Sequence, residues 1–292
     1  MDFLKEYNLK KDVIEKRIDE IFKNEKFSSE SLKEIMEYAV RNGGKRMRPI
    51  LFLSAYELLD KNYKNALSFA CALEFIHSYS LVHDDLPAMD NDDLRRGKPT
   101  CHVKYSYYGA ILAGDALLNY AFETMLSSSE SFDLKNAIKT MKIIADASGN
   151  KGMCAGQMAD MECDTDTFEK LSKMYENKTG ALIKASILGG FRLAGGNDEE
   201  AYILEKFSNL LGLIFQIKDD LLDVESTAEV LGKPIFSDEK NGKNTFVSEY
   251  GNEKCRELIE EYKLSAFSLL DSLPYDTAFL KEIVVYTAER KY

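Results

Sequence analysis

The chain has 292 residues, enough for one large domain or two of ordinary size, and 45% of them are hydrophobic. Its formal net charge of −11 argues against a general nucleic-acid binder, although local basic residues can still bind an anionic substrate. The five cysteines are scattered and form no Cys-x-x-Cys pair, which favours a reducing compartment. Met1 to Glu25 lacks an apolar signal region, and no apolar run reaches the ~18 residues of a membrane span. We therefore expect a cytoplasmic protein without a membrane span.

Apolar residues recur at helical spacing along most of the chain. The spacing predicts helices over residues 3–22, 28–40, 50–59, 66–82, 101–126, 134–147, 168–193, 202–224, 255–270 and 279–292. No strand-like alternation extends beyond a few residues, and the sequence contains no evident linker or low-complexity tract. A single all-α domain spanning residues 1–292 is the predicted architecture.

A basic turn, Gly43 to Pro49, separates the second and third predicted helices. Its two glycines free the backbone, and Pro49 suits the first turn of a new helix. Lys45 and Arg48 are three positions apart, so they share one face of that turn. Two cations beside a glycine-rich turn at a helix N-terminus are typical of an anion site. An ordinary basic connection between helices would look the same.

The helix predicted over residues 66–82 is apolar on nearly every side and leads into an acidic stretch. That stretch holds Asp84, Asp85 and Asp90 and is followed by Arg95-Arg96. Carboxylates so close together resist joint ionisation, and the C-terminal end of a helix disfavours them further. Divalent cations such as Mg²⁺ would relieve this repulsion. The alternative, a solvated acidic loop, is disfavoured by the arginines, the apolar lead-in and a second acidic cluster downstream.

The second cluster, Asp219 to Asp223, ends another buried helix, predicted over residues 202–224. Asp219 and Asp223 lie on one helical face. If the two helices pack side by side, their clusters face one another across a cavity and can hold phosphate oxygens through Mg²⁺. The surrounding cations exceed the need of one diphosphate, which suggests two: they are Lys45, Arg48, Arg95, Arg96, Lys178 and Lys233.

Two further polar groups lie inside apolar helices. His77 sits about two turns before the acidic stretch, and we interpret it as functional, although a lone histidine in such a helix is more often a satisfied core residue. Lys178 and Thr179 interrupt the helix predicted over residues 168–193 and need partners if they are buried.

From about residue 30 to its C-terminus, the chain resembles the trans-isoprenyl diphosphate synthases. The two aspartate-rich motifs of that family are matched by Asp84 to Asp90, followed by Arg95-Arg96-Gly97, and by Asp219 to Asp223. Further matches are Gly43 to Pro49, Gly156-Gln157, Lys178-Thr179-Gly180, Phe215-Gln216 and Gly232-Lys233. Each motif is weak alone, but their order is specific. The chain most resembles the bacterial farnesyl diphosphate synthases, whose first motif has the same two-residue Pro-Ala insertion.

The resemblance implies an isoprenoid-synthase-type helical bundle around a central cavity. It implies Mg²⁺-dependent 1′-4 condensation of isopentenyl diphosphate with dimethylallyl and geranyl diphosphate, through an allylic carbocation, to farnesyl diphosphate. Three Mg²⁺ ions would act with substrate bound, Mn²⁺ could substitute for them, and the protein would be a homodimer.

The resemblance also implies roles for individual residues. The metal ligands would be Asp84, Asp85, Asp90, Asp219 and Asp223. The allylic diphosphate and its carbocation would be bound by Arg95, Lys178, Thr179, Gln216 and Lys233, of which the last four are also the candidate catalytic residues. Isopentenyl diphosphate would be held by Lys45, Arg48, His77 and Arg96. The loop after Gly232-Lys233 departs from the family pattern at Phe236-Ser237, which weakens any role for Lys243 and Thr245.

Product length is predicted from Tyr79 and Ser80, the fifth and fourth residues before Asp84. Their helical positions direct them into the pocket where a growing chain would extend, and an aromatic ring there would form a floor, although core packing alone would also explain it. A geranylgeranyl or geranyl diphosphate synthase is the runner-up. A terpene cyclase is disfavoured by the all-aspartate second motif, and a non-catalytic partner subunit by the presence of every aspartate and of Lys178-Thr179.

Overall fold

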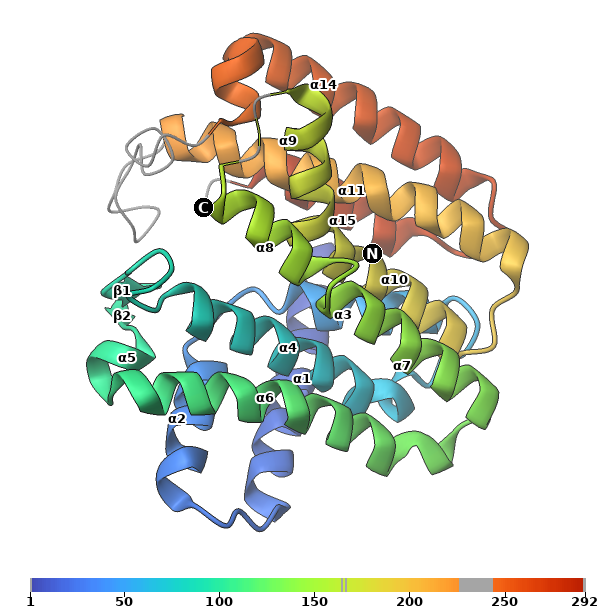
Figure 1. The fold of residues 1–292 in the computed structure, drawn as a ribbon. Helices are drawn as coiled ribbons and strands as arrows, with labels where there is room; N and C mark the ends of the chain where they lie inside the picture. The colour runs from blue at the N-terminus through green and yellow to red at the C-terminus, as the bar shows by residue number, and fades with distance from the viewer. Residues whose placement is uncertain (1, 164, 166, 226–243, 291–292) are drawn as a thin grey trace.

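A computed structural model describes residues 2–163, 165, 167–225 and 244–290, and these residues are almost entirely helical (Figure 1). The predicted all-α class is therefore confirmed. The helices are α1 (Phe3–Asn24), α2 (Glu30–Arg41), α3 (Met47–Glu57), η1 (Tyr63–Ala66), α4 (Leu67–Asp84), α5 (Cys101–Lys104), α6 (Tyr107–Ser128), η2 (Ser129–Ser131), α7 (Leu134–Ser148), α8 (Met153–Met161), α9 (Phe168–Tyr175), η3 (Glu176–Gly180), α10 (Ala181–Leu193), α11 (Asp198–Glu225), α14 (Phe246–Asp271) and α15 (Ala278–Glu289). No helix in the described ranges is both long enough and apolar enough to cross a bilayer.

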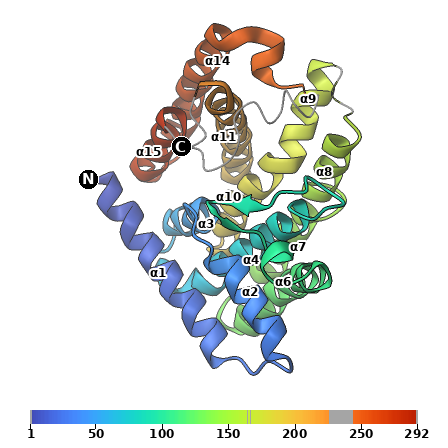
Figure 2. The ribbon, with the colours of Figure 1, turned by 90° about the vertical axis from the view of Figure 1, so that its left-hand side faces the viewer.

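The two helices that end in aspartates, α4 and α11, run in the same direction. In Figure 1 both extend from right to left, so their acidic C-terminal ends lie on the same side of the molecule. They do not form a closely packed pair, however. Helix α3 packs against α4, α10 packs against both α3 and α11, and Figure 2 shows α3 and α10 between the two aspartate-bearing helices. The side-by-side packing considered from the sequence is thus replaced by an arrangement in which α3 and α10 hold the two acidic ends apart.

A two-stranded hairpin projects from the acidic stretch after α4. Strands β1 (Leu94–Arg95) and β2 (Lys98–Pro99) pair antiparallel, with Arg95 opposite Lys98. Both turn residues have positive φ, 54° at Arg96 and 74° at Gly97, as the tight primed turns of hairpins require. The strands are too short to produce an alternating pattern, so sequence periodicity could not reveal them.

Helices α1 and α15 brace the basic turn before α3. The rings of Phe3, Tyr7, Phe279 and Tyr286 pack together, with centroids 5.3 to 5.7 Å apart. The Tyr7 hydroxyl then donates a hydrogen bond of 2.7 Å to the backbone carbonyl of Lys45. The position of this turn therefore depends on both the first and the last described helix.

Two predicted helices are interrupted. The helix expected over residues 101–126 breaks into α5 and α6, because the Ser106 side chain accepts a hydrogen bond of 3.1 Å from the Gly109 N–H and caps α6. The helix expected over residues 168–193 contains one turn of π-helix, η3, between α9 and α10. A π-helical turn within a helix is frequently found at functional sites.

Helix α14 begins earlier than the expected start at residue 255. Thr245 caps it at Phe246, and the helix kinks at Gly251, whose φ of 76° lies in the left-handed region. Thr245 thus has a structural role in the described chain.

Candidate active site

The first aspartate motif begins at the last residue of α4. After the helix ends at Asp84, the chain curls back, and the Asp90 N–H donates a hydrogen bond of 2.9 Å to the Asp84 carbonyl. Asp85 is buried and accepts a hydrogen bond of 2.6 Å from Nε of Arg95. Burial raises the pKa of Asp85 to about 6, while Arg95 opposes the rise. The motif therefore contains one carboxylate that is already neutralised by an arginine.

The three aspartates of the second motif have different surroundings. Asp219 forms an ion pair of 2.7 Å with Arg290, which follows α15. Asp220 is buried and accepts hydrogen bonds from the Tyr175 hydroxyl and the backbone N–H of Phe246. Asp223 is also buried. Asp220, which the sequence did not suggest as a ligand, thus links α9 and α14 to α11.

The residues predicted to bind isopentenyl diphosphate lie around the basic turn. The Arg48 guanidinium lies 3.4 Å from Nε2 of His77, measured from its Nη1. Arg96 reaches the same turn from the β1–β2 hairpin and donates a hydrogen bond to the Gly43 carbonyl. A Cβ atom added at Gly44 would lie 2.7 Å from Nη1 of Arg96, so only glycine admits the guanidinium so closely.

Burial disfavours the charged forms of the basic groups around this turn. Burial lowers the pKa of Lys45 to about 8, nearby Arg290 lowers it further and Asp219 opposes the shift. Burial likewise lowers the pKa of Arg48 to about 10. His77 has a pKa well below its ordinary value because of burial and the adjacent Arg48, so its ring is neutral near pH 7. Nε of Arg48 is buried and has no hydrogen-bond partner among the described residues. An anion bound here would relieve each of these penalties.

Arg46 lies between Lys45 and Arg48, which are predicted to bind isopentenyl diphosphate, but its own side chain turns into the protein. Its guanidinium contacts Glu15 at 2.7 Å and Glu74 at 2.6 Å, and it also donates to the Val40 carbonyl. Its backbone has a φ of 53°, in the left-handed region. This buried ion-pair cluster holds the turn in place.

The predicted catalytic residues Lys178 and Thr179 lie in η3, and Gln216 lies on α11, against which η3 packs. Nζ of Lys178 pairs with Oδ2 of Asp160 at 2.7 Å. The Gln216 amide donates a hydrogen bond of 3.3 Å to Asp220. Lys233, predicted to act with them, falls outside the described residues, as does Lys243.

The predicted product-length residues have different environments. Tyr79 is buried, and its hydroxyl lies 3.5 Å from the Ser148 carbonyl and 3.8 Å from Sγ of Cys154. The Ser80 hydroxyl instead donates to the His77 carbonyl of its own helix, at 2.8 Å. Tyr79 therefore spans from α4 to the connection between α7 and α8, whereas Ser80 is satisfied locally.

The donor set of the two motifs suits Mg²⁺. Carboxylate oxygens are hard ligands, and Mg²⁺ usually takes only one or two of them together with phosphates and waters. In the part of the chain that the structure describes, no three acidic, histidine or cysteine side chains form a ready-made metal cage.

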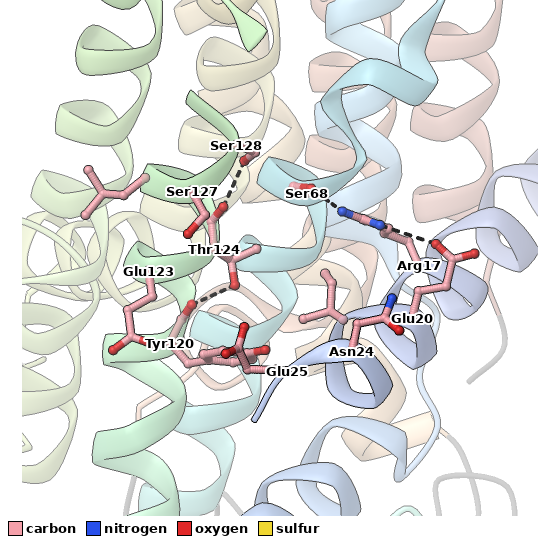
Figure 3. Close-up of a pocket in the computed structure, with 12 residues that line it drawn as sticks. Arg17, Glu20, Asn24, Glu25, Ser68, Tyr120, Glu123, Thr124, Ser127 and Ser128 are labelled. Carbon is pink, nitrogen blue, oxygen red and sulfur yellow. Dashed lines mark hydrogen bonds and ion pairs between the residues drawn. The ribbon is translucent and has the colours of Figure 1, made fainter. Parts of the chain in front are cut away.

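A separate cavity of about 530 Å³ lies between α1, α4 and α6 (Figure 3). Figure 3 shows Arg17 bonded to Glu20 and Ser68, and Thr124 bonded to Tyr120 and Ser128. Ser68 is near the start of α4, whereas Asp84 is at its end. None of the described residues predicted for the site lines this cavity, so it is separate from the candidate site at the aspartate-bearing ends of α4 and α11.

Sequence reasoning gave no role to three residues that contact the site. Arg290 pairs with Asp219, Asp160 pairs with Lys178, and Arg46 anchors the basic turn. Two of these contacts had a weak signal in the sequence. Asp160 is a charged residue within a short apolar segment, and Arg290 is a basic residue close to the C-terminus.

Comparisons with known proteins agree with this geometry. The polyprenyl synthetase family model matches residues 29–267. The farnesyl diphosphate synthase of Micrococcus luteus is 41% identical over 261 residues, which cover 89% of each chain. The large subunit 1 of a heterodimeric chloroplastic geranylgeranyl pyrophosphate synthase of Arabidopsis thaliana is 42% identical over 241 residues, covering 80% of this chain and 65% of that one.

The solved structures include a similar geranyltransferase from Helicobacter pylori, in complex with magnesium and isoprenyl diphosphate. Its TM-score is 0.82 at 32% identity, with 98% of this chain and 96% of that one covered. The resemblance identified in the sequence is therefore confirmed. The chain belongs to the polyprenyl synthetase family and is a prenyltransferase.

Proposed function

We propose that this prenyltransferase condenses isopentenyl diphosphate with dimethylallyl and then geranyl diphosphate to give farnesyl diphosphate, with Mg²⁺. The observation that carries the proposal is the proximity of the second aspartate motif to the basic turn. Asp219 and Arg290 both influence the pKa of Lys45, and Asp219 also influences that of Arg48. Two kinds of group that can bind a diphosphate, carboxylates that could hold metal ions and the cations of the basic turn, therefore lie near one another.

The allylic diphosphate would be held at the aspartate motifs. The residues proposed to hold Mg²⁺, as three ions for which Mn²⁺ could substitute, are Asp84, Asp85, Asp90, Asp219 and Asp223. When bound, the ions would stabilise the charge that develops on the departing diphosphate. Arg95, Lys178 and Lys233 would supply further positive charge to the same phosphates.

The carbocation left behind would be stabilised by dipoles rather than by a nucleophile. Thr179 and Gln216, together with the backbone carbonyl of Lys178, are the proposed groups. The π-helical geometry of η3 supports this role, because it departs from regular α-helical hydrogen bonding at the residues concerned.

Isopentenyl diphosphate would occupy the basic turn, held by Lys45, Arg48 and Arg96. Neutral His77 would accept from Arg48 and so orient its guanidinium. The double bond of isopentenyl diphosphate would attack the carbocation, forming the new C–C bond. The proton then lost would pass to the released pyrophosphate.

The proposal also assigns the residue that would limit product length. The buried Tyr79 phenol reaches the α7–α8 connection and would stop a growing chain at farnesyl. Because the relatives include both farnesyl and geranylgeranyl synthases, the alternative product is geranylgeranyl diphosphate.

We also propose that the enzyme is a cytoplasmic homodimer. Large apolar side chains are exposed along α6 and α7, and a second copy is the proposed occupant of this surface: Tyr108, Leu112, Leu126, Leu134 and Ile138. The heterodimeric Arabidopsis relative supports association between chains of this fold. Light scattering of the purified protein should give twice the 33.1 kDa chain mass, and a monomer would contradict the proposal.

The activity test uses purified protein, isopentenyl diphosphate and geranyl diphosphate with and without Mg²⁺. We expect pyrophosphate release only with the metal, and farnesyl diphosphate as the main product by chromatography. A main product of geranylgeranyl diphosphate would retain the reaction but refute the product assignment. Absence of turnover with every allylic diphosphate would instead indicate a non-catalytic partner subunit.

A further inference from the structure

Helix α8 packs directly on the π-helical turn that carries Lys178. At Gly156 an added Cβ atom would lie 2.1 Å from the backbone nitrogen of Lys178 and 2.6 Å from its Cα. No side chain fits into such a space without moving the turn. The backbones of α8 and η3 are therefore in contact, and the distance between these two elements is fixed.

Two side chains on the same face of α8 extend from this contact in different directions. Asp160 is buried, and its Oδ2 lies 2.7 Å from Nζ of Lys178. Gln157 is three positions earlier, and its amide donates a hydrogen bond to Oδ1 of Asp84. One helical turn thus contacts both the first aspartate motif on α4 and the lysine of η3.

We propose that Gly156, Gln157 and Asp160 form a positioning unit, the α8 bracket, that sets the separation and orientation of Asp84 and Lys178. Gln157 donates to Oδ1 of Asp84 and so fixes the orientation of the carboxylate. Asp160 holds the end of a long, flexible side chain at a defined point. The inference rests on the proposed roles of Asp84 as a metal ligand and Lys178 as a diphosphate-binding group.

The physical reason for such a unit lies in the flexibility of its two targets. An aspartate at the end of a helix can rotate its carboxylate, and a lysine has a flexible four-carbon stem. Hydrogen-bonding partners of metal ligands orient them, and their loss typically weakens metal binding or activity by about 10–100-fold. The Gly156 contact makes the two orientations interdependent, because both partners belong to the same turn.

Purified full-length variants test the two arms of the bracket separately. Free Mn²⁺, measured by its paramagnetic resonance signal in the presence of inorganic pyrophosphate, reports metal binding without turnover. We expect Gln157→Leu to weaken Mn²⁺ binding by roughly tenfold. Met158→Gln is the matched control, since Met158 is exposed on the same turn, and it should bind Mn²⁺ like the wild type. Gln157→Met serves as a second variant if the leucine protein does not fold.

The Asp160 arm is tested with a double-mutant cycle. Asp160→Asn should lower kcat by about tenfold, leave the KM for isopentenyl diphosphate unchanged, and be partly rescued in Asp160→Glu. If Asp160 acts through Lys178, then Asp160→Asn should have no further effect in a Lys178→Met background.

The outcomes distinguish the bracket from a structural contact. A wild type without Mn²⁺ binding or prenyl transfer would overturn the proposed function itself, before any variant is made. Given an active wild type, the bracket is refuted if the Gln157 variants bind Mn²⁺ like Met158→Gln. It is equally refuted if Asp160→Asn causes the same loss with and without Lys178, or only lowers the thermal unfolding temperature.

Discussion

Asp219 and Asp220 are adjacent, yet we expect their removal to damage different properties. Asp220 is 2% exposed, and its carboxylate accepts hydrogen bonds from the Tyr175 hydroxyl at 3.2 Å and from the Phe246 N–H at 2.9 Å. Asp220→Ala leaves these two buried donors without this acceptor, whereas the Gln216 amide, a third donor at 3.3 Å, is only partly buried. Each such loss costs roughly 1–3 kcal/mol. The free energy of unfolding should therefore fall by about 2–6 kcal/mol.

The same substitution at Asp219 should lower stability less. The Asp219 side chain is 43% exposed, and its partner Arg290 keeps a hydrogen bond of 2.7 Å to the Phe215 carbonyl. Because Asp219 is partly exposed, solvent already screens this ion pair, and its loss should cost less than the loss of the buried hydrogen bonds of Asp220. Turnover should nevertheless fall by orders of magnitude, because Asp219 is a proposed metal ligand.

Urea unfolding followed by circular dichroism, combined with pyrophosphate release, compares the two variants. Asp220→Asn retains one acceptor oxygen and should give an intermediate loss of stability if the alanine protein is too unstable to purify. Equal stability losses at the two positions would refute this reading of the α11 geometry. So would an Asp220→Ala protein of wild-type stability.

The remaining predictions concern product length, pH and the basic turn. Tyr79→Ala should lengthen the main product, and an unchanged chromatogram would show that Tyr79 is only a core residue. Because the pKa of Lys45 is about 8, its ammonium loses its proton as the pH rises through 8. The affinity for pyrophosphate, measured by calorimetry, should therefore fall about tenfold between pH 7 and pH 9. The control is Lys45→Arg, whose guanidinium stays charged and whose affinity should not show this fall. Arg46→Met leaves the buried Glu74 carboxylate without its cation and should lower the free energy of unfolding, measured by urea titration, by about 3–5 kcal/mol. A loss below about 1 kcal/mol would contradict the role assigned to this ion pair.

The helical architecture could be predicted because it depends on local apolar spacing. The predicted helix over residues 66–82 corresponds to α4, and its acidic end lies where expected. The backbone return of Asp90 to Asp84 follows a proline, Pro87, which cannot continue a regular helix. These features require only neighbouring residues, so one sequence is enough to reveal them.

The misses involve pairings between distant segments. Arg46 turns inward because it pairs with Glu74 on α4, which is distant in the sequence. No local pattern distinguishes Arg46 from Lys45 and Arg48. The pair of Arg290 with Asp219 likewise joins α15 to α11. Periodicity specifies which face of a helix is buried, but not which partner a charged side chain meets.

Because the π-helical turn η3 lies between α9 and α10, the rotation of α9 relative to α10 depends on the number of residues in η3. Helices α9 and α10 adjoin it on either side, and one residue of an α-helix corresponds to a rotation of ~100°. Deleting one residue from η3 would give an uninterrupted α-helix with its apolar pattern largely intact. It would also rotate Tyr175 away from Asp220 relative to α10. The apolar periodicity of such a sequence would still predict a normal helix. The side chains of α9, however, would be rotated relative to those of α10 and would no longer meet their partners at this site.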